Sequence, residues 1–374
     1  MSAGKSASIH AHFADLTDPR RRIGTYPLIN IVVIAVCAVI CGADDFVAIA
    51  QFGRTKRKFL EKFLDLSSGI PSHDRFNAIL GAILPAEFEK CLLSWITSLH
   101  EITAGQIVAI DGKTLRRSFD TASSKSAIHM VSAWATANHL TLGQVVVDAK
   151  SNEITAIPKL LEILEIEKCL VTIDAMGCQT EIAQAILDRD ANYVLAVKEN
   201  QPTLYDAVTE HFLNHLEDDF ARTKVSQYET EEKGHGREET RSYLVCKIPK
   251  DFPVRSRWPG LIAIGMAINY VIQNGKQTDF VRYYILSKVL TARRFAAAVR
   301  GHWSIENNLH WQLDVNFNED QCRIRKGNAD QNFSSLRRTA LSLLKNNETA
   351  KVGIKNKRLL AAMDEDYLLE VMLG

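Results

Sequence analysis

The sequence predicts an α/β protein in which a mixed β-sheet core follows an all-helical N-terminal domain and carries a β-rich insertion. Apolar residues recur at helical spacing over the first hundred residues; short apolar runs then alternate with helical segments, and a group of β-type runs interrupts this alternation. A chain of 374 residues has room for these parts. We place the helical domain at residues 1–100, the sheet domain at residues 101–346 and a C-terminal tail at residues 347–374.

The helical domain is predicted from a series of apolar and amphipathic segments. Pro27 opens Leu28–Gly42, which is apolar on nearly all sides and is therefore expected to be a buried helix. Its most apolar stretch, Ile31–Cys41, has 11 residues, whereas a membrane span needs about 18 or more, so no membrane association is expected. Ser72 stands where it would cap a helix over Asp74–Leu84. Further helices are expected at Asp44–Gly53, Arg54–Leu66 and Ala86–Leu99.

The sheet core is predicted at residues 101–198 and 291–346, on either side of the insertion at residues 199–290. Three successive strands and then an alternation of helix and strand are the order expected of a ribonuclease H-like mixed sheet. The expected core elements are strands Ile107–Ile110, Ile128–Ala135 and Thr141–Val147, helix Ile154–Leu164, a strand ending at Asp174, helix Thr180–Leu187 and strand Tyr193–Val197. In the insertion we expect helix Thr203–Leu216 and strands Arg241–Ile248, Leu261–Val271 and Thr278–Leu286.

Two apolar runs of the core each end in an acid, Asp111 and Asp174, followed closely by glycine. Glycine after a short apolar run marks the end of a buried strand. A carboxylate at such a position costs several kcal/mol to bury unless a cation or hydrogen-bond donors meet it. Two neighbouring carboxylates repel each other unless a positive charge lies between them. The pair therefore predicts a site for Mg²⁺ or Mn²⁺ at the edge of the sheet.

A helical segment after Thr291 carries His302, Glu306 and His310 at i, i+4 and i+8, so that the three share one face. Trp303 and Trp311 lie beside them in the sequence. Such a row either binds a transition metal on its own or presents a carboxylate to the edge of the sheet.

Charge and cysteine content narrow the class of protein. The formal net charge is only +1, but seven basic clusters, several of them near the candidate acids, favour a polyanionic partner. Seven cysteines without CxxC spacing indicate free thiols in a cytoplasmic, reducing compartment. The chain has no GxxxxGK[ST] or GxGxxG motif, which argues against a nucleotide cofactor, and no GxSxG or HExxH motif.

Several long strings in the sheet domain match a known family. They are IDGK with the following Arg pair (Asp111–Arg117), KSNEITAIPKLL (Lys150–Leu161), TIDAMGCQ (Thr172–Gln179), VKENQ (Val197–Gln201) and HWSIENNLHWQLDVNFNED (His302–Asp320). They resemble the DDE transposases of bacterial insertion sequences, and in particular the H-repeat-associated group. DPR (Asp18–Arg20) and GIPSHDRF (Gly69–Phe76) resemble the helical domain that accompanies this catalytic domain. The resemblance covers nearly the whole chain.

The resemblance implies a DDE triad of Asp111, Asp174 and Glu306 that holds Mg²⁺ or Mn²⁺, as two ions, with Glu319 as the alternative third acid. It implies phosphodiester hydrolysis at the ends of an insertion element, strand transfer into double-stranded target DNA and a homo-oligomer on that DNA. Related enzymes carry Tyr, Arg and Lys around the last acid, where this chain has Val299, His302 and Leu313. Any such auxiliary role must therefore pass to other residues.

The residues expected to contact DNA are basic or aromatic side chains near the acids and at the tip of the insertion. They are Lys113, Arg116, Arg117, His235, Arg237, Arg300, His302, Trp303, Arg323 and Arg325. Three other interpretations stay open: a ribonuclease H-like nuclease that cuts without joining strands, a DNA-binding remnant of an insertion element that no longer catalyses, and a zinc enzyme centred on His302, Glu306 and His310.

Overall fold

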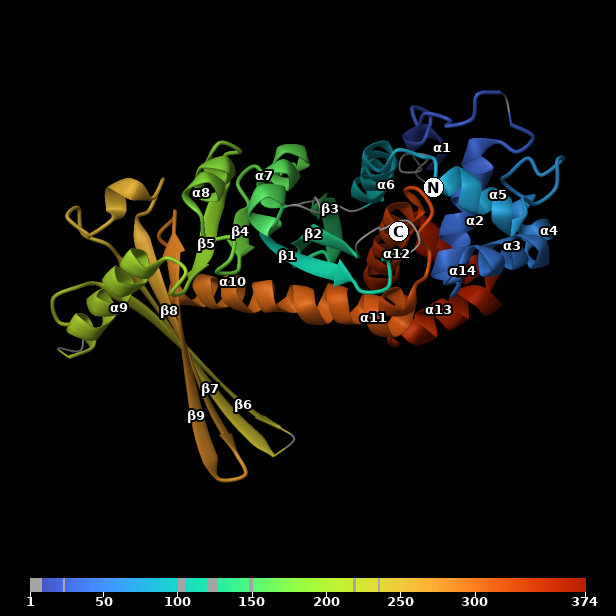
Figure 1. Cartoon of the computed structure of the whole chain (residues 1–374). Coiled ribbons are helices and arrows are strands. Elements are labelled where there is room, and N and C mark those ends of the chain that lie inside the picture. Colours follow the sequence, from blue (N-terminus) through green and yellow to red (C-terminus); the bar gives the residue numbers. More distant parts are fainter. Residues whose placement is uncertain are drawn as a thin grey trace, which may run out of the picture.

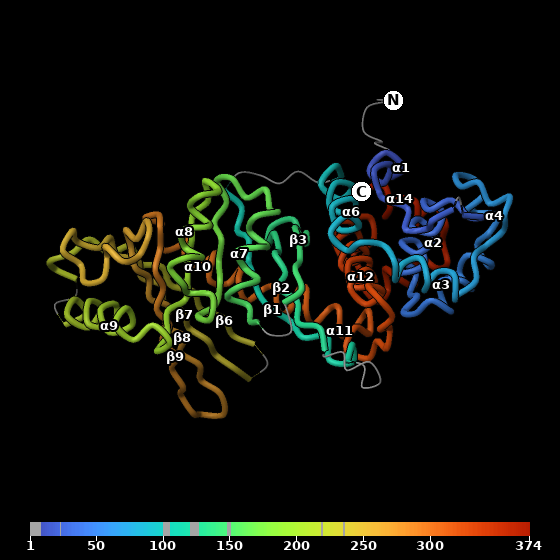
Figure 2. Tube along the Cα trace, turned by 45° about the horizontal axis from the view of Figure 1, so that its top comes forward, coloured from blue at the N-terminus to red at the C-terminus, as the bar shows by residue number. Residues whose placement is uncertain are grey.

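The structure is a computed structural model of the chain and describes residues 9–22, 24–99, 105–119, 127–147, 151–217, 220–234 and 236–374. Figure 1 shows helices gathered at one end, a sheet in the middle and a β-arm at the other end. A long helical rod made of α10 (Ala292–Ile305) and α11 (Trp311–Phe317) runs beneath the sheet and joins the two ends. Figure 2, turned by 45°, shows the same succession.

The core sheet has the strand order β3-β2-β1-β4-β5. The strands are β1 (Ile107–Leu115), β2 (Ile128–Ala135), β3 (Leu140–Val147), β4 (Leu170–Ile173) and β5 (Asn192–Val197). β2 is antiparallel to β1 and β3, whereas β1, β4 and β5 are mutually parallel. Helices α7 (Glu153–Ile163) and α8 (Thr180–Leu187) cover one face, and α10 packs on the other. The predicted ribonuclease H-like mixed sheet is confirmed.

One predicted strand end is wrong. Asp111 and Gly112 were expected to terminate the first strand, but β1 continues to Leu115, because residues 108–115 pair with β2 without interruption. β1 is parallel to β4 only up to the pair Ile110 and Ile173, where β4 ends. The strand therefore passes the acid instead of stopping at it.

The insertion extends the same sheet by four antiparallel strands in the order β9-β8-β7-β6, with α9 (Pro202–Leu216) beside them. These strands are β6 (Val225–Gly234), β7 (Arg237–Lys247), β8 (Ala263–Gln273) and β9 (Lys276–Leu286). Only Tyr283–Leu286 of β9 pairs with β5, so the distal halves project as an arm (Figure 1). β6 was not predicted, because its run of four acidic or polar residues around Glu231 has low strand propensity.

The helices at the other end come from both ends of the sequence. The N-terminal ones are α1 (Ile9–His12), α2 (Leu28–Ile40), α3 (Phe46–Thr55), α4 (Arg57–Leu60), α5 (His73–Leu80) and α6 (Pro85–Leu99). The Ser72 hydroxyl accepts from the Arg75 N–H at 3.3 Å and caps α5, as predicted. α12 (Ala329–Asn346), α13 (Ile354–Met363) and α14 (Glu365–Leu373) share one apolar core with them. None of the described helices is both long and apolar enough to cross a membrane.

Candidate active site

Two of the predicted acids lie on neighbouring strands of the core. Because Ile110 of β1 is in parallel register with Ile173 of β4, Asp111 and Asp174 occupy the next position on each chain. Burial raises the pKa of Asp174; N–H donation from Gly177 opposes this rise, and the negative charge of Asp111 adds to it. Burial also disfavours ionisation of Asp111, but the nearby imidazoles of His310 and His302 outweigh it and lower the pKa of Asp111.

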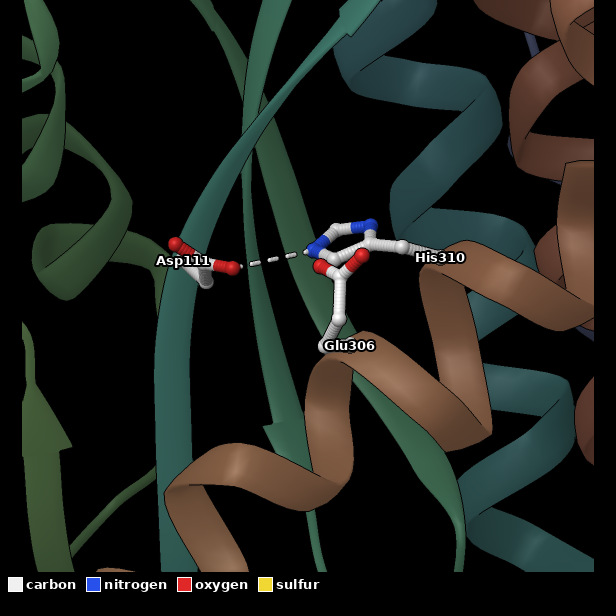
Figure 3. Close-up of side chains that lie close together, drawn as sticks. All are labelled: Asp111, Glu306 and His310. Carbon is white, nitrogen blue, oxygen red and sulfur yellow. Dashed lines mark ion pairs between the residues drawn. The ribbon is translucent and has the colours of Figure 1, made fainter. Parts of the chain in front are cut away.

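The third acid reaches this place from the helical rod. Between α10 and α11 the residues Glu306–His310 form a π-helical turn, closed by the Trp311 N–H donating to the Glu306 carbonyl. One ligand atom each from Asp111, Glu306 and His310 lie within 4.8 Å of one another. Figure 3 shows the Glu306 carboxylate and the His310 ring pointing toward Asp111. Single π-helical turns inserted in α-helices are frequent at functional sites.

Of the two histidines of the predicted row, one belongs to this cluster and the other contacts β4. His310 Nε2 is 3.3 Å from Asp111 Oδ2, and the His310 side chain is 4% exposed. His302 Nδ1 lies 3.3 Å from the hydroxyl of Thr172, in β4. Burial lowers the pKa of His302, against the opposing effect of Asp111 and Asp174. The His302 ring is therefore directed toward the sheet and lies in the surroundings of Asp111 and Asp174.

The alternative third acid, Glu319, is enclosed in a different environment. Its side chain is 1% exposed and accepts from Arg338 Nη1 at 2.9 Å, from the Ser334 hydroxyl at 2.9 Å and from Lys113 Nζ at 3.2 Å. Burial opposes its ionisation, but Arg338 and Lys113 prevail and lower the pKa of Glu319 to about 2. A carboxylate held in this way is an internal counter-ion.

The same network contains Lys113, one of the residues expected to contact DNA. Its ammonium, with a side chain that is 9% exposed, contacts Asp314 and Glu319 and donates to the His310 carbonyl at 3.5 Å. The Lys113 side chain thus connects β1 with α11, the part of the rod that follows the π-helical turn.

The other residues expected to contact DNA are mostly at the surface. Arg117 and Arg323 are exposed, and Arg116 is exposed beside Asp320. Arg325 lies over the Phe119 ring. Arg237 forms an ion pair with Glu239, and Arg300 forms one with Glu232. His235 lies outside the described residues. Trp303 is 51% exposed and carries the Arg282 guanidinium 4.7 Å from its ring centre.

Trp303 and Arg282 line one wall of a polar pocket of about 600 Å³ between the arm and α10. A second pocket of about 800 Å³ contains Asp174 and the VKENQ segment, and Arg282 belongs to both. Arg282 was not among the residues predicted to contact DNA, because it is an isolated basic residue in a β-type run.

Sequence reasoning also missed a hydrogen-bonded pair next to the acids. His129 Nε2 of β2 lies 2.7 Å from Glu153 Oε1, at the start of α7. A Cβ atom at Gly112 would collide with the Glu153 carboxylate, so glycine beside Asp111 leaves room for this pair. The only sequence signal was the position of Glu153 inside the KSNEIT string.

Comparisons with known proteins identify the family of the chain. Residues 103–343 match the family model described as "Transposase DDE domain", and residues 10–96 match the one described as "DDE_Tnp_1-associated". The chain therefore belongs to the DDE transposase family.

Individual relatives point to one group within the family. The chain is 42% identical over 358 residues to "H repeat-associated putative transposase YhhI" of Escherichia coli (strain K12), covering 93% of each chain. It is 44% identical over 351 residues to "Putative transposase YncI" of Escherichia coli O157:H7, covering 93% of this chain and 89% of that protein. The predicted resemblance to the H-repeat-associated group is confirmed.

Proposed function

We propose that this transposase hydrolyses phosphodiester bonds at the ends of an insertion element and transfers the freed strands to target DNA, with Asp111, Asp174 and Glu306 as its catalytic acids. Two observations support the proposal: Asp111 and Asp174 follow register partners on β1 and β4, and ligand atoms of Asp111, Glu306 and His310 lie within 4.8 Å of one another. Glu306 is preferred to Glu319 because its side chain is exposed toward this cluster, whereas Glu319 is enclosed by cations.

The residues present suit a divalent cation. Carboxylates are ligands that Mg²⁺ and Mn²⁺ prefer, and like charges brought this close favour a positive ion among them. A bound pair of such ions lowers the pKa of water and stabilises the attacking and leaving oxygens of an in-line displacement. Asp111, Asp174 and Glu306 would hold the ions. The Thr172 hydroxyl orients His302. The Asp174 carboxylate is oriented by the backbone N–H groups of Met176 and Gly177, which donate to it.

The surroundings support binding of DNA next to the acids. Trp303 is half exposed and has the Arg282 guanidinium over its ring; a base stacked on this side chain would contribute about 1–3 kcal/mol. Arg116, Arg117 and Arg323 offer exposed charge to phosphates beyond β1. Because the two ends of an element must be processed together, we propose that the protein acts as an oligomer on DNA.

Product analysis tests the proposal. The full chain is incubated with DNA carrying the repeats that flank its own gene, with Mg²⁺ or Mn²⁺, and the products are sequenced. Strands joined to target DNA are expected. Cut ends without joining would identify a nuclease, and binding without cleavage would identify a silent remnant; either would contradict strand transfer. Activity that requires Zn²⁺ and survives loss of Asp111 would favour the histidine-centred zinc enzyme.

Neutralising surface arginines is expected to weaken the salt dependence of DNA binding. Each phosphate contact adds about one unit to the slope of log affinity against log salt. The double variant Arg116→Ala with Arg117→Ala should therefore bind more weakly at low salt, with a slope smaller by about two. Fluorescence anisotropy with a labelled duplex measures this.

Lys168→Ala is the matched control, since Lys168 precedes β4 at the end of the strand opposite Asp174 and is exposed. It should leave the slope unchanged. An unchanged slope in the double arginine variant would remove this surface from the DNA-binding site.

A further inference from the structure

His310 is a buried polar side chain whose hydrogen bonding is incomplete. The residue as a whole is 3% exposed; Nε2 contacts the Asp111 carboxylate at 3.3 Å without hydrogen-bond geometry, and Nδ1 has no hydrogen-bond partner among the residues that the structure describes. Buried polar side chains nearly always have a partner, and leaving one unsatisfied costs about 1–3 kcal/mol. The position of this ring at the acidic cluster therefore requires an explanation other than packing.

The ring is aimed at the acids. His310 Nε2 faces Asp111 Oδ2 at 3.3 Å, and the Glu306 carboxylate lies within 4.8 Å of both (Figure 3). Two ligands of one cation at about 2.1 Å from it lie about 3 Å apart when adjacent and about 4 Å apart when opposite. Small adjustments of these three side chains would thus let them hold one ion.

The backbone around His310 holds this orientation. The π-helical turn begins at Glu306 and ends at His310, so that both side chains leave the rod toward β1. Beyond the turn, Lys113 donates to the His310 carbonyl and pairs with Asp314 and Glu319. Lys113 lies in β1, the strand that carries Asp111, so the same strand holds the backbone of His310 in place.

We propose that His310 is a nitrogen ligand of the divalent cation held by Asp111 and Glu306, and that this site takes Mn²⁺ in preference to Mg²⁺. The inference rests on the proposed function, in which these acids hold a catalytic ion. Mg²⁺ strongly favours oxygen ligands, whereas imidazole is a good ligand for first-row transition metals. A mixed set of two carboxylates and one imidazole shifts the preference toward Mn²⁺.

Electron paramagnetic resonance of Mn²⁺ bound to the full chain, without DNA, tests the assignment. Electron spin echo modulation detects a nitrogen coordinated to Mn²⁺, and incorporation of histidine labelled with the heavier nitrogen isotope identifies it as imidazole. We expect this coupling in the wild type, its loss in His310→Gln and its retention in His302→Gln, the matched control. Mn²⁺ affinity should fall at least about tenfold in His310→Gln, while Mg²⁺ affinity changes much less.

Coupling that persists in His310→Gln but disappears in His302→Gln would overturn the assignment, as would its absence from Mn²⁺-saturated wild type. The labelled wild type is informative even if His310→Gln does not fold. Failure of the two proposals can be told apart. Cleavage that requires Asp111 and Asp174 without histidine coupling would contradict only the ligand assignment, whereas histidine coupling without any cleavage would contradict only the proposed function.

Discussion

Replacing Asp174 with Asn is expected to reduce metal-dependent strand cleavage at least about a thousandfold while DNA binding survives. The substitution keeps the shape of the side chain but removes the charge that, beside Asp111, attracts the cation. Metal ions contribute several kcal/mol of charge stabilisation in the transition state, and about 1.4 kcal/mol corresponds to a factor of ten in rate. Single-turnover cleavage of an end oligonucleotide in Mg²⁺ measures the rate, and anisotropy with the same duplex measures binding.

Asp188→Asn provides a matched control, because Asp188 is an exposed acid at the end of α8 and accepts from Gln184. It should cleave at the wild-type rate. Asp111→Asn should behave like Asp174→Asn, since the two acids occupy equivalent positions on paired strands. Normal cleavage by either variant would show that these acids are not the catalytic pair.

Replacing Glu319 with Gln is expected to lower the free energy of unfolding by about 3–5 kcal/mol. The change leaves Arg338 buried without its counter-ion and removes one of the two carboxylates that contact Lys113. Urea denaturation measures the loss. Glu61→Gln is the control, because Glu61 pairs with Arg57 on an exposed helix surface, where such pairs contribute about 0–1 kcal/mol.

The pH dependence of the unfolding free energy should also show the contribution of ionised Glu319. The pKa of Glu319 falls from 4.5 to about 2 on folding, so its ionised form stabilises the protein fully above about pH 4.5. That contribution is lost progressively as the pH falls from 4.5 toward 2. Glu319→Gln should show a shallower loss of stability over this range. An unfolding free energy within 1 kcal/mol of wild type at neutral pH, roughly the value for an exposed pair, would contradict the buried network.

The core strands and the N-terminal helices could be predicted because their sequence signals are local. An apolar run such as Ile107–Ile110 reflects the burial of a strand, and the pattern after Ser72 reflects the capping of a helix. β6 escaped prediction because its acidic side chains are tolerated on a projecting arm, where the solvent-exposed face needs no apolar residues. The shared core of α2 and α12 depends on packing between segments about three hundred residues apart, which no local pattern reports.

Part of the candidate site could also be predicted, because some of its signals are local in the sequence. Asp111 and Asp174 stand out as charges at the ends of apolar runs, and the spacing of His302, Glu306 and His310 indicates one helical face. The resemblance favoured Glu306 and left Glu319 as the alternative, because the environment that separates them depends on which acid contacts Lys113 and Arg338 in space. The π-helical turn that directs His310 toward Asp111 has no recognisable sequence pattern.

In the proposed site, Glu306 completes a metal site with Asp111 and Asp174. The single-turnover rate of metal-dependent cleavage of an end oligonucleotide by Glu306→Gln tests this assignment, with Glu181→Gln, at an exposed acid of α8, as the control. We expect Glu306→Gln to bind DNA but not to cleave it in Mg²⁺, while the control cleaves normally. Cleavage by Glu306→Gln at the wild-type rate would show that Glu306 is not a catalytic acid.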